Sequence, residues 1–384
     1  MTERKYFLDW LRVAAFFCLI LFHVGCLYAS WTYNLKSLRL PPHVDDILLA
    51  LHPWRMALLF LISGVAARHF IDRKGAGAFA GDRLRRLVPV MVFASLVVIP
   101  PQTFVEALDK HLVDEPYLTF WLHDYLGFNL ALMKAMHKLL PAYDHLWFLI
   151  YLLAYALVLA AMAGVARLVT KPTPPRALPL WLLVAVPGIW LVLTTWLMER
   201  VWPATFWPLN DWGSHLRWGG MFLLGYGLAV QDAFWAWTKR RKGWLLLLAI
   251  VCLALQTLNR AYYLTGKDDP MWSAIRWSLA SGLYAWFAIC ALLGYGSQYL
   301  NRPSAVLSHL NEAILPVYVL HQPVLLVTAW WLFPLHLPLM EEAAALVGAT
   351  ALGSFAIYEL LIRPFGPMRV LFGLKFSRRP ASPA

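Results

Sequence analysis

The sequence predicts an all-α integral membrane protein, a bundle of about ten transmembrane helices with both termini in the cytoplasm. Of its 384 residues, 60% are hydrophobic and only 14% are charged, which is more apolar surface than a soluble domain can bury. Apolar segments of spanning length recur along the chain, and Lys and Arg gather in every second connection. A single membrane domain, residues 1–384, accounts for the whole chain.

The apolar segments follow one another with short connections. Each is close to the ~20 residues that a helix needs to cross the hydrocarbon core of a bilayer. The sixth is the least certain span, because His215 and Arg217 fall in its first turns. The predicted spans are residues 7–28, 47–67, 87–105, 145–168, 178–198, 212–231, 243–260, 274–296, 309–332 and 343–362.

Positive charge fixes the predicted orientation. Most of the 33 Lys and Arg lie before the first span and after the even-numbered ones, which places those connections in the cytoplasm. The cytoplasmic loop at about 68–86 is the most basic of them. The longest external loop, about 100–144, is rich in aromatic residues and His, and we expect one or two interfacial helices in it over an external cavity. Topology therefore explains the net charge of +12, and lipids rather than nucleic acid are the expected partners.

The first span carries the sharpest candidate residues. Arg12 and His23 are eleven residues apart, about three helical turns, so they share one helix face with ~16 Å between them along the axis. An ionisable group at membrane depth costs at least ~2.5 kcal/mol, which makes it a functional hypothesis. A neutral His23 can act as general base on a hydroxyl. A structural His23, bonded to a neighbouring helix, is about equally compatible with the sequence.

A basic cluster, DRLRRLVP, opens the third span. Arg83 and Arg86 share a helix face with Arg85 between them, at a cytoplasmic entrance where guanidinium groups can bind phosphates bidentately. Charge alone favours a simpler role, in which the three arginines only anchor the topology.

Further polar residues are candidate contacts to an acyl group or an acceptor. Two prolines flank the mid-membrane His321 and predict a broken helix lining a cavity. Glu359 and Arg363, four residues apart at the end of the last span, are expected to form an ion pair whose role is more readily structural. The possible contacts are Arg55, His145, Arg217 and His321.

Motifs for other chemistries are missing from the sequence. It shows no phosphate-binding glycine loop, no nucleophile elbow and no metal-binding His helix. The four cysteines lie inside apolar segments without ligand-like spacing. We therefore expect neither a metal nor a tightly bound cofactor.

Several motifs in this order resemble the membrane acyltransferase-3 family. They are the Arg and His of the first span, RLRRLVP, FLISG, DHLWFL, VYVLHQP and the final YE followed by RP, and the resemblance covers nearly the whole chain. It implies transfer of an acyl group from a cytoplasmic thioester to a glycan hydroxyl on the outer side. It carries Arg12 and His23 as the catalytic pair and Arg83 with Arg86 as the donor-side motif.

More narrowly, the chain resembles members of the family that succinylate osmoregulated periplasmic glucans. This likeness implies succinyl-CoA as co-substrate, a periplasmic glucan as acceptor, other glucan biosynthesis proteins as partners, and a multi-pass location in the bacterial inner membrane. Two alternatives stay open from the residues: a glycan or lipid exporter that uses Arg12, His23 and His321 as a pathway, and an O-acetyltransferase of another surface polysaccharide.

Overall fold

The computed structural model describes residues 5–169 and 176–376, and within these ranges it contains helices and no strands. Nine of the described helical segments are long and apolar enough to cross a membrane, which confirms the predicted helical membrane bundle. They are Tyr6–Cys26, Val44–Lys74, Ala76–Asp109, Asp144–Val169, Leu180–Arg200, Asp232–Leu264, Pro270–Tyr299, Ala305–Leu335 and Leu339–Ile362.

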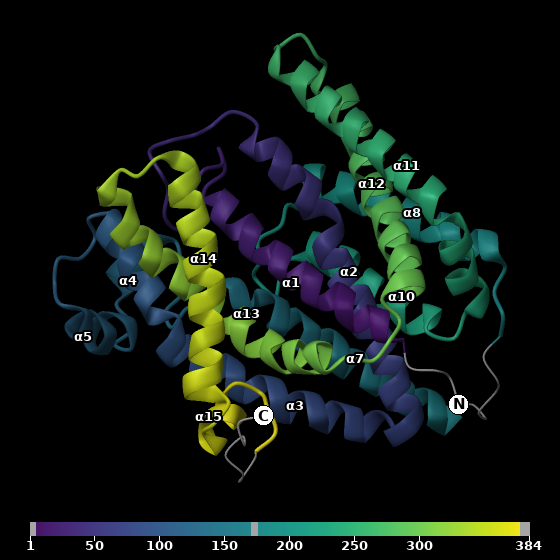
Figure 1. Cartoon of the computed structure of the whole chain (residues 1–384), viewed down its shortest axis with the longest axis horizontal. Helices are drawn as coiled ribbons and strands as arrows, with labels where there is room; N and C mark the ends of the chain where they lie inside the picture. Colours follow the sequence, from purple (N-terminus) through teal and green to yellow (C-terminus); the bar gives the residue numbers. More distant parts are fainter. Residues whose placement is uncertain (1–4, 170–175, 377–384) are drawn as a thin grey trace. The chain divides into compact units, whose positions relative to one another are not determined.

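The described residues form fifteen α-helices, most of them labelled in Figure 1. Short π-helical or 3-10 turns join several of them, at Ala94–Val98, Phe120–Tyr125, Asp144–Leu146, His215–Gly219, Phe333–Leu335 and Tyr358–Ile362. The α-helices are α1 (Tyr6–Cys26), α2 (Val44–Lys74), α3 (Ala76–Phe93), α4 (Pro100–Asp109), α5 (Tyr117–Thr119), α6 (Leu130–Met136), α7 (Trp147–Val169), α8 (Leu180–Arg200), α9 (Trp212–Ser214), α10 (Gly220–Leu228), α11 (Asp232–Leu264), α12 (Pro270–Tyr299), α13 (Ala305–Leu332), α14 (Leu339–Ile357) and α15 (Gly366–Leu371).

The sixth predicted span differs from the others. In place of one long helix over 212–231, α9, a π-helical turn and α10 run from Trp212 to Leu228, and this segment is not among the nine spanning helices. The polar residues of its first turns lie in the π-helical turn. The cytoplasmic placement of both termini stays a prediction.

The region predicted as a cytoplasmic loop, 68–86, is helical except at Gly75, and its cytoplasmic side stays a prediction. Residues up to Lys74 belong to α2 and residues from Ala76 belong to α3, so the connection is Gly75, whose φ of +86° is a conformation that glycine adopts without strain. The sequence between the two spans is rich in good helix formers, so both helices continue through its charged residues. The third span accordingly begins at Ala76 and ends at Asp109 rather than covering 87–105.

The region predicted as the external loop, 100–144, contains helical structure of its own. It begins with α4, the end of the third spanning segment, and continues through α5, a π-helical turn and α6. Asn129 caps α6, since its side chain accepts hydrogen bonds from the backbone of Ala131 and Leu132. The interfacial position of these short helices stays a prediction.

The chain forms two compact units. The first unit consists of the described parts of residues 1–15, 49–82 and 151–307, and the second unit consists of those of 16–48, 83–150 and 308–384.

Glycines allow close helix packing in the first unit. A Cβ on Gly64 of α2 would lie 1.9 Å from the carbonyl oxygen of Phe222 in α10, and one on Gly225 would lie 2.0 Å from the carbonyl oxygen of Leu61. The two backbones therefore touch at these glycines, as the small residues in FLISG suggest. The helices α11 and α12 lie side by side as an antiparallel pair (Figure 1).

The core of the second unit is apolar and joins segments distant in sequence. It includes Val24 of α1 and Leu27 just after it, Val105 of α4, Leu325 of α13 and Leu346 of α14, all at most 5% exposed. This core surrounds the C-terminal end of α1, on which His23 lies.

Candidate functional site

The first helix is continuous from Tyr6 to Cys26, so Arg12 and His23 lie on one helix as predicted. Arg12 forms an ion pair with Asp9, one turn earlier, with 3.1 Å between Nη1 and Oδ1. Arg12 belongs to the first unit and His23 to the second. The two residues have different surroundings.

His23 lies in a cluster of three histidines that come from separate parts of the chain. The ring of His321 on α13 is 5.1 Å from that of His23 and 5.2 Å from that of His145, measured between centroids. His321 and His145 are buried, with 1% and 5% of their surface exposed. The structure therefore brings together three of the histidines that the sequence proposed one by one.

A hydroxyl group orients His23. The phenolic oxygen of Tyr33 is 2.8 Å from Nδ1 of the imidazole. Burial, reinforced by Cys26 and the carboxylates of Asp144 and Glu106, raises the pKa of Tyr33 well above its ordinary value. Tyr33 therefore keeps its proton, and a hydrogen bond at Nδ1 fixes how the ring of His23 turns.

Proline chemistry explains the position of His145. The helix α13 is continuous through Pro316 and Pro323, so the predicted break around His321 is wrong. Because Pro323 has no N–H, the carbonyl of Val319 lacks its usual helical donor. Nε2 of His145 donates to that carbonyl over 3.0 Å instead. The hydrogen bond from His145 replaces the one that Pro323 cannot donate, so the helix continues where the two prolines predict a break.

His321 is held by its own helix. Its Nδ1 donates to the carbonyl of Tyr318, three residues earlier, and the Tyr318 hydroxyl donates to the carbonyl of His145. With the proton on Nδ1, the neutral imidazole of His321 carries its lone pair on Nε2.

A buried network of charged and amide groups occupies the same unit. Glu106, 3% exposed, accepts hydrogen bonds from Lys138 over 2.6 Å, from Lys110 over 2.7 Å and from the amide of Asn34 over 2.6 Å. Lys138 also pairs with Asp144 at 3.0 Å. Burial by itself lowers the pKa of Lys138, but the carboxylates of Asp144 and Glu106 outweigh it, so the pKa is raised.

Amide side chains complete this network. Gln102 donates to Asp144, and Gln322, next to His321 in sequence, donates to Asn34 over 3.3 Å. The network thus runs from α13 through Asn34 to Glu106 and Asp144, beside the histidine cluster. Groups that are this well bonded hold fixed positions, which favours a preorganised polar site.

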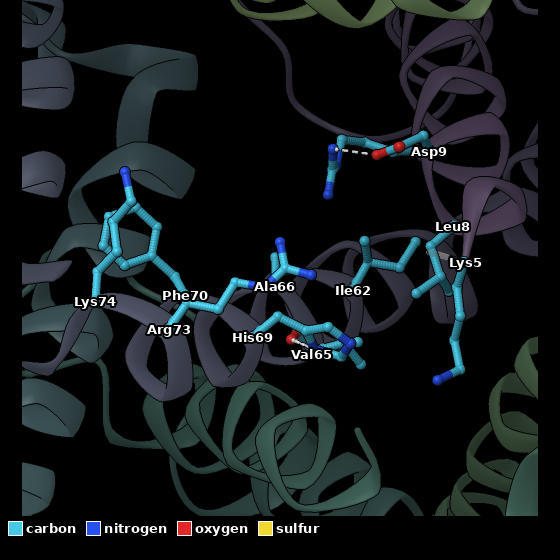
Figure 2. Close-up of a pocket in the computed structure, with 11 residues that line it drawn as sticks. Lys5, Leu8, Asp9, Ile62, Val65, Ala66, His69, Phe70, Arg73 and Lys74 are labelled. Atoms are coloured by element: carbon cyan, nitrogen blue, oxygen red, sulfur yellow. Dashed lines mark hydrogen bonds and ion pairs between the residues drawn. The ribbon is translucent and has the colours of Figure 1, made fainter. Parts of the chain in front are cut away.

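Arg12 borders a cavity in the first unit. The cavity has a volume of about 430 Å³ and lies between the start of α1 and the second half of α2 (Figure 2). It is lined by Lys5, Leu8, Asp9, Arg12, Ile62, Val65, Ala66, His69, Phe70, Arg73 and Lys74. Burial lowers the pKa of Lys5, with Asp232 opposing the effect.

The basic cluster of the third span lies within α3 rather than at its entrance. Arg85 and Arg86 are exposed, Arg83 is partly buried, and Nε of Arg86 donates to the carbonyl of Gly373 over 3.2 Å. None of the three lines the cavity of Figure 2. Their role in donor binding stays a prediction.

Arg55 and Arg217 are interior residues of the first unit. They are 2% and 5% exposed, and Arg217 donates to the hydroxyl of Thr195 and lies 5.2 Å from the ring of Trp218. The histidine cluster belongs to the second unit. Contact with an acyl group stays a prediction for both.

Glu359 and Arg363 form the ion pair that their spacing predicts, with 2.8 Å between Nη1 and Oε2. Glu359 also pairs with His309 of α13 at 2.6 Å. The pair therefore connects the last spanning segment to α13, which fits a structural role.

Sequence reasoning missed Tyr33, Asn34, Glu106 and Lys138. Glu106 had a signal, since it is an acid one turn from Gln102 on an otherwise apolar helix. No such signal marks Lys138 and Tyr33, because they lie in connections where charged and aromatic residues are ordinary. Lys5, Arg73 and Lys74 carry only the charge pattern that predicts topology, and nothing in the sequence marks the cavity that they line.

The arrangement supports proton transfer more directly than metal chemistry. Three imidazoles at contact distance, a phenol and a fixed carboxylate–lysine network can hold and move a proton. Within residues 5–169 and 176–376, no group of three or more His, Cys, Asp or Glu side chains has the geometry to hold a metal ion.

No curated protein and no solved structure matches the chain. A family model does, and it is described as an acyltransferase domain. The match extends over residues 5–359, which includes α1 with Arg12 and His23, the buried network and α13. The protein therefore belongs to this family of acyltransferases and is a multi-pass membrane acyltransferase.

Proposed function

We propose that this acyltransferase moves a succinyl group from cytoplasmic succinyl-CoA to hydroxyl groups of a periplasmic glucan, with His23 as general base, in the bacterial inner membrane. The family match supports the acyl transfer. The choice of donor and acceptor rests on the similarity of the sequence to glucans biosynthesis protein C, the succinyltransferase of osmoregulated periplasmic glucans.

In this mechanism His23 removes the proton from a glucose hydroxyl as its oxygen attacks the thioester carbonyl. A C–O bond forms, the C–S bond breaks, and the CoA thiolate leaves and takes up a proton. The products are the glucan ester and free CoA. The cluster of His23, His321 and His145 is the observation that best supports this role, because it surrounds one imidazole with others that can share the proton.

The donor must reach His23 from the cytoplasmic end of α1. Arg12 and His23 are about three turns apart on this helix, ~16 Å, a distance that the pantetheine arm of CoA can span. In the proposal Arg83, Arg85 and Arg86 attract the donor on the cytoplasmic side. Arg55 or Arg217 binds the succinyl carboxylate as it passes.

Purified protein in lipid nanodiscs tests the proposal. Supplied with succinyl-CoA and a periplasmic glucan, it should release free thiol and add one succinyl mass to the glucan, as read by mass spectrometry. Acetyl-CoA in place of succinyl-CoA distinguishes the donor, and a lipopolysaccharide or exopolysaccharide in place of the glucan distinguishes the acceptor. Glucan movement across the bilayer without thiol release would instead identify an exporter.

A further inference from the structure

The cavity between α1 and α2 carries positive charge that base catalysis at His23 does not use. Lys5, Arg73 and Lys74 line it together with the Asp9–Arg12 ion pair. Among its described lining residues Asp9 is the sole acid, and its charge is already matched by Arg12. The cavity therefore presents three further cations, of which Lys5 also lies 5.2 Å from the ring of Trp235 and feels the charge of Asp232.

Apolar side chains from both helices also line the cavity. They include Leu8 of α1 and Ile62, Val65 and Phe70 of α2, and the ammonium group of Lys74 lies 5.4 Å from the ring of Phe70. In Figure 2 the Arg73 side chain extends from the end of α2 toward the residues of α1. A volume of about 430 Å³ falls within the range of small-molecule sites.

We propose that this cavity binds the phosphate groups of the acyl donor's nucleotide, with Lys5, Arg73 and Lys74 as the phosphate contacts. The identity of the donor as a CoA ester rests on the proposed function. The site itself rests on the cavity, its charge and its apolar side chains.

Phosphate is the ligand chemistry that suits these walls. A phosphate monoester or a diphosphate carries about two negative charges, and three cations around one space match them better than they match a single carboxylate. Arg73 offers bidentate hydrogen bonds, and the lysines add compact charge. A flat base can lie against Phe70 and the aliphatic side chains. The 3′-phosphate, diphosphate and adenine of CoA supply all of these features.

The proposal separates two sets of basic residues. Arg83, Arg85 and Arg86 do not line the cavity, so they act at most in attracting the donor, whereas Lys5, Arg73 and Lys74 bind it. An acidic phospholipid headgroup has the same phosphate chemistry and is the other source of ligand. Mutation and lipid composition distinguish these cases.

Direct binding of CoA to the full chain in phosphatidylcholine nanodiscs, followed by calorimetry, is the test. Arg73→Gln combined with Lys74→Gln should raise the Kd for CoA at least tenfold. Arg240→Gln combined with Arg241→Gln removes the same charge from exposed positions on α11 and should change the Kd less than twofold. Higher salt should weaken binding by the wild type more than by the first variant, because exposed charges are screened.

The comparison ligand is dephospho-CoA, which lacks the 3′-phosphate. It should bind the wild type more weakly than CoA, and the difference should shrink in the Arg73 and Lys74 variant. If that variant keeps the wild-type affinity for CoA and Arg86→Gln abolishes CoA binding, the proposal is overturned and the phosphate contacts lie on α3. If neither the wild type nor the variant binds CoA, and the variant loses affinity for phosphatidylglycerol, the donor assignment is overturned. The cavity is then a lipid-binding site.

These outcomes are independent of the proposed function. A wild type that binds CoA through Arg73 and Lys74 but transfers no succinyl group refutes the glucan succinyltransferase and leaves the site intact. A wild type that transfers succinyl with unchanged CoA affinity in the variant refutes the site and leaves the function intact.

Discussion

The cavity beside Arg12 and the histidine cluster around His23 use polar residues in opposite ways. At the cavity, Arg73 and Lys74 are exposed and surround an open space. At the cluster, His321 and the neighbouring Glu106 are buried, and hydrogen bonds to Tyr318 and Lys138 hold them in place. Open cations suit the capture of a charged ligand, whereas buried and bonded groups suit chemistry that needs fixed geometry.

The largest effect should come from His23 in the histidine cluster. His23→Ala should lower the rate of acyl transfer by about 100-fold or more, since a general base contributes about 10²–10⁴-fold. Release of free thiol from the acyl-CoA in nanodiscs measures the rate. His123→Ala, at an exposed position in the turn Phe120–Tyr125, is the matched control and should keep the wild-type rate. Wild-type turnover by His23→Ala would remove its catalytic role.

The second effect should appear in stability. Glu106→Gln removes a charge that Lys138 and Lys110 both contact, and should lower the free energy of unfolding by about 2 kcal/mol. Denaturant titration in mild detergent measures it. Glu341→Gln removes a carboxylate from an exposed position in the first turn of α14 and should cost less than about 0.5 kcal/mol. Equal losses in the two variants would show that the buried network adds no stability of its own.

A smaller effect should follow from the hydroxyl that orients His23. Tyr33→Phe removes the 2.8 Å hydrogen bond at Nδ1 and should slow transfer about fivefold, close to the ~1 kcal/mol of one hydrogen bond. The pH–rate profile should also shift, because His23 loses a partner that favours one protonation state. Tyr262→Phe, exposed on α11, should change neither the rate nor the profile. A slower rate with an unshifted profile would reduce Tyr33 to a packing role.

The smallest effect concerns pH. The pKa of Lys138 is raised in the folded protein, so its contribution to stability is fully present below the ordinary lysine value of about 10.4 and is lost as pH rises through the folded value. Unfolding midpoints should therefore be independent of Lys138 between about pH 6 and 9. The decline above that range should be weaker in Lys138→Met. A Lys138-dependent loss that begins below pH 9 would contradict the raised pKa.

Helix positions were largely predictable from the sequence, because spanning length and apolar composition leave few alternatives to a helix in lipid. The failures have physical causes. The segment from Trp212 to Leu228 is shortened where polar residues enter, the connection at Gly75 is tighter than charge patterns suggest, and α13 passes two prolines unbroken.

The candidate site was predictable only in part. His23, His145 and His321 stand out because imidazoles in apolar segments need a reason, yet nothing in the sequence says that they meet. Lys138 and Tyr33 gain their meaning from contacts with residues far along the chain, such as Glu106 and Asp144. Charge patterns predict the side of the membrane on which Arg73 and Lys74 lie, but not the cavity that they share with α1.

The proline at position 323 has a consequence for how the protein assembles. Its missing N–H leaves the Val319 carbonyl to be satisfied by His145, so the hydrogen-bond ladder of α13 is completed by a residue from another spanning segment. An unsatisfied carbonyl in lipid costs several kcal/mol. During biogenesis α13 would carry that cost from its insertion until the Asp144–Leu146 turn docks against it. The proline that leaves the Val319 carbonyl without its helical donor thus favours docking of this turn onto α13.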